Sequence, residues 1–135
     1  MSYQVFIKKF ENGLPAFIPF KELTAVLSKY GALEEGHFGL EFVSSVGDVC
    51  EDAPIVGKGK SEITGISFNR PTLHDQLPLI VFDLLSIENT CFFGPDLEYM
   101  QSRSEMKQHL PESLKTHYPN GPQIITNPTK SWPLE

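Results

Sequence analysis

Apolar and polar residues alternate along several segments of this chain, and a period of two predicts β-strands. In residues 3–10, for example, Val5 and Ile7 fall on the side opposite to Phe6 and Phe10. By the same pattern and by their flanking turns, further strands are expected at residues 37–43, 46–50, 62–69 and 90–93, with an edge strand at residues 123–126.

Apolar residues spaced by three and four predict two main helices. The first is expected over residues 19–30, with Pro19 in its first turn and Gly31 as the residue that ends it. The second is expected to start after Asp75 as N-cap, because Pro78 then falls in the first turn, where its missing N–H removes no hydrogen bond. Apolar residues occupy most faces of this second helix, so we expect it to be largely buried.

Two further helical signals lie downstream. Ser102 and Glu105 fit a capping box, which predicts a short helix over residues 103–110. Pro111 is suited to begin another helical turn through Leu114.

This order of elements predicts an α+β fold: a mostly antiparallel sheet with two main helices packed on one face. It also fits a ferredoxin-like split βαβ core with an added hairpin and a C-terminal helical extension. The length of 135 residues suits one domain, expected over residues 1–118, followed by a tail over residues 119–135 that packs on it. Trp132 is expected to fold back onto the body of the domain.

Charge changes this picture because it is unevenly distributed. Seventeen acidic and eleven basic residues give a formal net charge of −6, so nucleic acid is a poor partner, while a basic protein would be attracted. Residues 31–57 contain no Lys or Arg and hold six acids, which we expect to form a partner-binding ridge: Glu34, Glu35, Glu41, Asp48, Glu51 and Asp52. Such a ridge is suited to cover the cationic cleft of a nuclease; a solvated loop without a partner is the alternative.

Two apparent catalytic motifs fail on their context. Residues 57–61, Gly-Lys-Gly-Lys-Ser, end like a phosphate loop, but Pro54 stands where that motif needs glycine and a strand is expected to follow. We therefore expect residues 53–60 to form a loop. Residues 65–69 imitate a nucleophile elbow until Asn69, which replaces the last glycine.

Metal and cofactor sites are not expected, because no His or Cys pair has ligand spacing: His37, His74, His109, His117, Cys50 and Cys91 stand apart. Cys91 lies in an apolar expected strand, where cysteine behaves as a small core residue. The alternative is an enzyme or ligand pocket assembled from distant residues, with Cys91, His74 and Asp96 as its candidates. A third possibility is a structural or phage-derived subunit.

Location follows from two negative observations. The first residues lack a basic segment followed by an apolar one, and the longest apolar stretch, residues 77–85, is interrupted by Asp83. We therefore expect a cytoplasmic protein, a monomer or weak homodimer with no membrane contact, whose two thiols are reduced.

Three segments resemble small bacterial immunity proteins of polymorphic or contact-dependent toxin systems: the opening residues 1–13 (MSYQVFIKKFENG), the acidic mid-section, and residues 91–96 (CFFGPD) followed by Leu110 and Pro111. The resemblance extends to about residue 114 and concerns the overall layout of the chain and not a diagnostic motif. It therefore assigns no residue a role. It implies a cytosolic antitoxin that binds one cognate toxin domain and has no turnover of its own.

Overall fold

The structure is a computed structural model that describes residues 4–36, 39–45, 50–71, 76–94 and 99–128. It confirms the α+β class. The elements are β1 (Gln4–Glu11), β2 (Leu14–Pro15), α1 (Phe20–Leu27), β3 (Gly31–Gly36), β4 (Gly39–Ser44), β5 (Cys50–Asp52), β6 (Ile55–Gly57), β7 (Ile63–Pro71), α2 (Gln76–Leu84), β8 (Thr90–Phe93), β9 (Met100–Ser102), the 3-10 helix η2 (Lys107–His109), α3 (Glu112–His117) and β10 (Gln123–Ile124).

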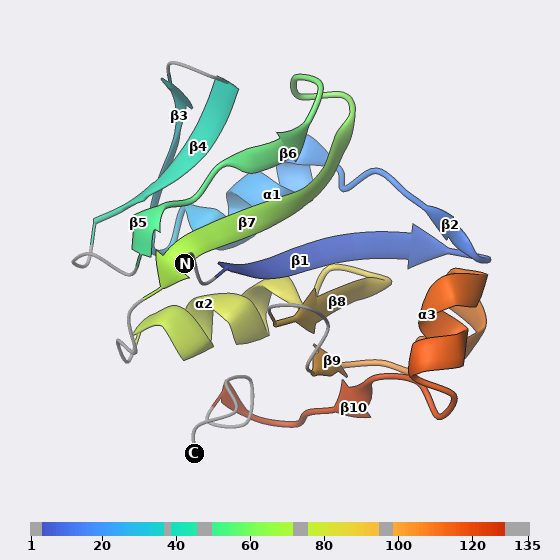
Figure 1. The fold of residues 1–135 in the computed structure, drawn as a ribbon. Helices are drawn as coiled ribbons and strands as arrows, with labels where there is room; N and C mark the ends of the chain where they lie inside the picture. Colours follow the sequence, from blue (N-terminus) through green and yellow to red (C-terminus); the bar gives the residue numbers. More distant parts are fainter. Residues whose placement is uncertain (1–3, 37–38, 46–49, 72–75, 95–98, 129–135) are drawn as a thin grey trace.

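The main sheet has the topology of a split βαβ unit. Its strand order is β10-β9-β8-β1-β7-β5, and β6 also pairs with β7. The central strands β8, β1, β7 and β6 are all antiparallel to their neighbours, and α1 and α2 provide the crossovers. The hairpin β3–β4 is added to this unit; of its two strands only β4 was expected, over residues 37–43. Strands β9 and β10 belong to the C-terminal extension (Figure 1).

The main core lies between this sheet and helices α1 and α2. On β1, Val5 and Ile7 face the helices, opposite Phe68 and Ile66 of β7. Each helix contributes one apolar stripe of buried residues: Leu23, Val26 and Leu27 from α1, and Leu77, Ile80, Val81 and Leu84 from α2. Burial of both stripes against the same face is what holds the two helices together.

A second, smaller core covers the opposite face at one end of the sheet. Met106 and Leu110, on either side of η2, are fully buried against Phe10, Cys91 and Phe93. Figure 1 shows α3 at this end, beside β2 and away from the hairpin. The C-terminal extension therefore completes the fold by covering apolar strand residues that α1 and α2 do not reach.

Three expectations differ from the structure: the end of the first helix, the role of Gly31, and the loop over residues 53–60. Helix α1 ends at Leu27, three residues before the expected end, and Gly31 begins β3 instead of stopping a helix. Glycine at residue 31 instead permits a close backbone approach within the hairpin: a Cβ atom there would lie 2.1 Å from the carbonyl oxygen of Val43. The expected loop over residues 53–60 likewise contains β6.

The prediction of a helix over residues 103–110 is wrong: only the short 3-10 helix η2 (Lys107–His109) forms there. Ser102 is the last residue of β9, and its hydroxyl donates to the carbonyl of Ser104 (2.6 Å) instead of capping a helix. Glu105 accepts a hydrogen bond from the backbone N–H of Lys107 (2.8 Å), which forms a local turn before η2. The helical turn expected at Pro111 is present as α3.

The segment after α3 returns to the sheet. Strand β10 pairs in parallel with β9 at the sheet edge, as expected, and Ile125 is buried in the main core. Trp132 and the expected N-cap Asp75 lie outside the described residues. None of the helices in the described part has the length and apolar character needed to cross a membrane.

Candidate functional site

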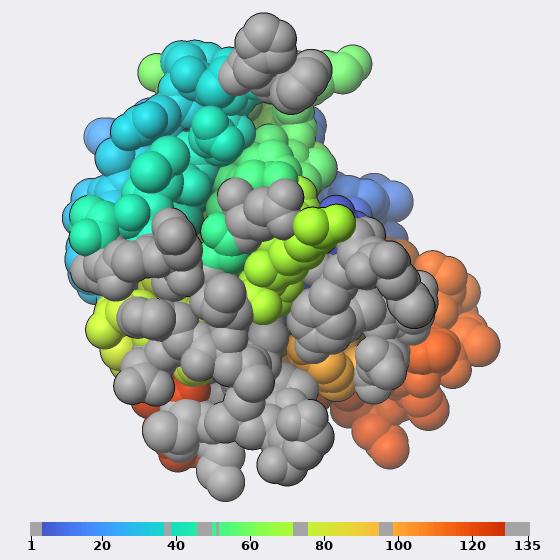
Figure 2. Space-filling view, turned by 60° about the vertical axis from the view of Figure 1, so that its left-hand side comes forward, coloured from blue at the N-terminus to red at the C-terminus, as the bar shows by residue number. Residues whose placement is uncertain are grey.

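The acidic segment forms the hairpin β3–β4, and strand alternation divides its side chains between two faces. In the register of the hairpin, Leu33 lies opposite Phe42 on the inner face, which packs on the main core. Glu34 lies opposite Glu41 on the outer face. Figure 2 shows this hairpin, in cyan, on the surface next to the green strands that follow it. We call Glu34, Glu41 and Asp52 the outer carboxylates.

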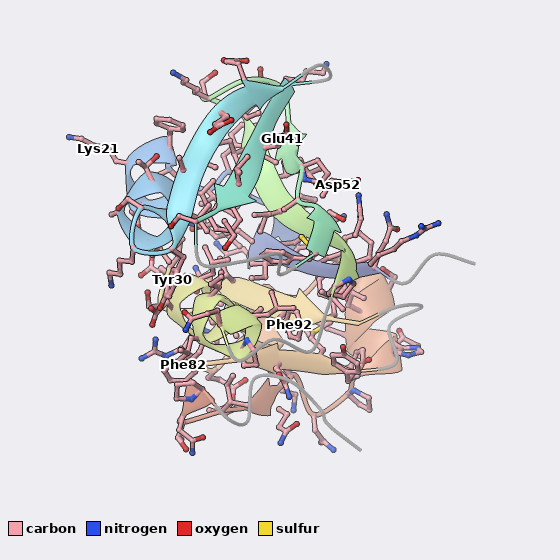
Figure 3. All side chains as sticks on the ribbon, turned by 90° about the vertical axis from the view of Figure 1, so that its left-hand side faces the viewer. Lys21, Tyr30, Glu41, Asp52, Phe82 and Phe92 are labelled. Carbon is pink, nitrogen blue, oxygen red and sulfur yellow. The ribbon has the colours of Figure 1, made fainter. Side chains whose placement is uncertain are left out.

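Glu41 and Asp52 line one pocket on the outer side of the hairpin. Its volume is about 370 Å³, and its remaining lining is apolar or backbone: Gly36, Gly39, Leu40, Pro54 and Ile55. The Glu41 side chain lies over Gly36, since a Cβ atom there would be 2.6 Å from Glu41 Oε1. Figure 3 shows Glu41 and Asp52 close together, whereas Lys21 of α1 points away from them.

Asp52 is oriented by a row of polar side chains across β5, β7 and β1. The Asn69 amide donates to the Asp52 carboxylate. The side-chain oxygen Oδ1 of Asn69 accepts hydrogen bonds from the Gln4 amide (2.7 Å) and from the Ser67 hydroxyl (2.8 Å). Because these two donors fix the amide, its N–H group is directed at Asp52, which holds that carboxylate in place.

Glu35 is separated from the outer carboxylates. It projects to the inner side of the hairpin, opposite Leu40, and lines a different pocket of about 480 Å³ together with Lys60. Asp48 lies outside the described residues, as does the side chain of Glu51. The six expected ridge residues are thus not one face: the structure brings three together, places one apart, and leaves two outside its description.

The outer carboxylates have no cationic neighbour at ion-pair distance in the described part of the chain. The ion pair found in that part of the chain joins Lys9 and Glu11 (3.7 Å), both in β1. The exposed Val43 (42%) lies on the same outer face, next to Glu41 along β4. This face combines unpaired negative charge with an exposed apolar side chain.

The glycine- and lysine-rich residues 57–61 form the turn between antiparallel strands β6 and β7, as the sequence predicted. Gly57 (φ 134°) and Gly59 (φ 71°) adopt left-handed backbone conformations that favour glycine. The backbone N–H of Lys58 donates to the carbonyl of Glu62 (3.1 Å), which closes the turn. A phosphate loop needs a helix at this point, and a strand stands there instead.

Cys91, the candidate nucleophile of the enzyme hypothesis, is fully buried in the second core. Burial raises the pKa of its thiol to about 12, so the thiol is protonated at neutral pH. Cys91 lines neither of the two pockets at the hairpin. Its expected partners His74 and Asp96 lie outside the described residues. Cys91 therefore has the environment of a core residue.

Metal-binding groups do not gather in the described residues: no three His, Cys, Asp or Glu side chains are placed to share an ion there. His109 accepts a hydrogen bond from the backbone N–H of Asn12 (3.1 Å) and ties η2 to the β1–β2 turn. His37 lies outside the described residues.

Two features of this region were not predicted from the sequence. The row formed by Gln4, Ser67 and Asn69 had a visible signal, because Ser67 and Asn69 fall on the same side of an alternating strand. The pocket shared by Glu35 and Lys60 had none, because it depends on how the hairpin folds over the β6–β7 turn.

Comparison with protein-family models, curated proteins and solved structures found no match to this chain.

Proposed function

We propose that this protein is a non-catalytic protein-binding module, an immunity protein that binds and neutralises a cognate toxin domain through the outer face of hairpin β3–β4. The expected partner is a basic toxin domain, and the expected site of action is the cytoplasm. The proposal rests on one observation above others: Glu34 and Glu41 are direct cross-strand partners, and neither forms an ion pair with a described residue.

Like charges at directly opposite strand positions destabilise a hairpin, by a few tenths of a kcal/mol up to about 1 kcal/mol. A bound Lys or Arg side chain would turn this repulsion into attraction. The pocket between Glu41 and Asp52 is suited to such a group, because its apolar walls fit the aliphatic part of the side chain and its carboxylates fit the charged end.

The charge of the whole chain supports the same type of partner. A formal net charge of −6, together with three carboxylates on one face, speeds the arrival of a basic protein. Close charge pairs across such an interface couple by about 1.5–7 kcal/mol. The exposed Val43 beside these carboxylates adds apolar area at the centre of the proposed contact.

Charge reversal on the hairpin tests the proposal. The double variant Glu34→Lys and Glu41→Lys is compared with the control Glu88→Lys and Glu112→Lys. The control makes the same change in net charge at exposed positions outside the hairpin, between α2 and β8 and in α3. The tagged proteins are used to capture partners from a lysate of the native host. The captured protein is then expressed alone or with each variant while cell growth is measured.

We expect wild type and control to capture one basic protein at equal stoichiometry and to protect cells from it. The hairpin variant should bind it at least about tenfold more weakly, with a reduced dependence on salt. Equal losses in both double variants would mean that net charge alone matters. If neither variant lost binding, the outer face would not be the contact surface.

A further inference from the structure

The inner side of the hairpin carries a pocket whose charged residues the proposed function does not use. The end of hairpin β3–β4 and the β6–β7 turn border an open pocket of about 480 Å³, a volume within the usual range of small-molecule sites. The pocket is lined by Glu35, Gly39, Leu40, Ile55, Gly57, Gly59, Lys60 and Ser61. Its lining residues thus include one with a carboxylate, one with an ammonium group, one with a hydroxyl and two with aliphatic side chains.

Glu35 and Lys60 share this pocket but do not pair. Neither takes part in an ion pair within the described residues, although opposite charges on flexible side chains attract each other. Lys60 has another contact: its ammonium lies 5.0 Å from the centre of the Phe20 ring, a cation–π geometry. Because Phe20 is partly buried against the main core, this contact holds Lys60 at the α1 side of the pocket.

The wall of the pocket also includes two aliphatic side chains. Leu40 comes from β4 and Ile55 from β6, while Gly57 and Gly59 contribute no side chain that would fill the space. A Cβ atom on Gly59 would meet no other atom within 4 Å. Ser61 follows Lys60 in the chain and also lines the pocket, so its hydroxyl is a further donor among the lining groups.

These groups define the chemistry of a ligand. An ammonium group would bind at Glu35, a carboxylate at Lys60 and Ser61, and an apolar side chain against Leu40 and Ile55. We infer that this pocket binds a free α-amino acid with an apolar side chain, because such a molecule carries all three features in one small frame. The inference does not depend on the proposed function, because the two pockets share Gly39, Leu40 and Ile55 but no charged side chain.

An NMR titration of the full chain tests this inference, with L-leucine as the probe and backbone amide shifts as the readout. We expect saturable shifts at the pocket residues Gly39, Leu40, Gly57 and Gly59, without shifts in α3. Leucinamide lacks the carboxylate and N-acetyl-leucine lacks the ammonium, so each should bind about tenfold or more weakly. Glycine, without the apolar side chain, should also bind more weakly. Leucinamide also represents the N-terminal residue of a peptide.

Variants in the pocket and at distant surface positions separate a specific site from general charge effects. Glu35→Gln and Lys60→Gln should each weaken leucine binding by about tenfold or more, whereas the controls Glu88→Gln and Lys115→Gln should leave it unchanged. The double exchange Glu35→Lys with Lys60→Glu should restore part of the lost affinity, because a zwitterion can bind in the reversed orientation. The spectrum of each free variant shows whether it is folded.

Three results would overturn the inference: no saturable shift with leucine, equal binding of leucinamide and leucine, or unchanged binding in Glu35→Gln and Lys60→Gln. The last two would leave a site of different chemistry. Loss of leucine binding in these variants with partner capture intact would separate this pocket from the outer face.

Discussion

The hydroxyl of Tyr30, three residues after α1, donates a hydrogen bond to the carboxylate of Asp83 in α2. Tyr30 also ends the turn that leads into hairpin β3–β4, and its carbonyl accepts a hydrogen bond from the backbone N–H of Ser45 (2.9 Å). One residue thus connects both main helices to the base of the hairpin. Figure 3 shows Tyr30 at this junction.

Tyr30 should show an unusual titration. Burial, and then the hydrogen bond and negative charge of Asp83, raise its pKa from 10.0 to about 12. Because the folded-state pKa is above the unfolded one, this contribution to stability is complete below about pH 10 and is lost as the pH rises to about 12. Ultraviolet titration should reveal this tyrosine, and Asp83→Asn should lower its pKa towards 10. An unchanged pKa in Asp83→Asn would contradict the contact.

Gly31 and Gly36 should differ in their response to alanine. In Gly31→Ala the new Cβ atom would meet the backbone of Val43, so we expect a loss of about 1–3 kcal/mol in the free energy of unfolding. In Gly36→Ala it would meet the flexible end of Glu41, and the loss should be below about 1 kcal/mol. Urea unfolding of both variants measures this difference. Similar losses would mean that the hairpin register differs from the one described.

Asn69→Asp should make stability depend on pH. The new carboxylate would retain acceptors for Gln4 and Ser67 but would face Asp52 with a second negative charge. The repulsion raises the pKa of the pair in the folded state, so the loss of stability should be present at neutral pH and diminish as both groups are protonated towards pH 3. Urea unfolding from pH 3 to 7 measures it. A loss independent of pH would indicate disrupted packing instead.

The two thiols should differ in reactivity. Cys91 is fully buried with a pKa of about 12, while Cys50 is partly exposed. A disulfide reagent at neutral pH should therefore modify Cys50 in the native protein and Cys91 only after unfolding. Cys50→Ser should remove the fast reaction, and Cys91→Ala should leave it. Fast modification of Cys91 would show that the second core opens readily.

Much of the fold could be predicted from local pattern. The alternation in residues 3–10 and 62–69 gave β1 and β7, and the helical spacing gave α1 and α2. Strand β3 could not be predicted in this way. A glycine such as Gly31 is typical of the end of a helix. What requires glycine here is the close approach of the Val43 backbone, which is a tertiary contact.

That missed strand also explains the candidate site. Neighbours in a strand point to opposite faces, so Glu34 and Glu35 belong to different surfaces although they are adjacent in sequence. Because the sequence pattern does not predict β3, all six acidic residues fall into one expected ridge. The capping box at Ser102 failed for a similar reason: this residue is buried in β9, where pairing with the sheet outweighs a local helix signal.

The division of the hairpin has a consequence for how such a protein can change. Leu33 and Phe42 fasten β3 and β4 to the core from the inner side, so the fold makes little demand on what occupies the outer positions. Replacement of Glu34 or Glu41 by a neutral residue should even relieve repulsion. On this proposed contact face, single substitutions can therefore change the specificity of recognition without compensating changes in the interior.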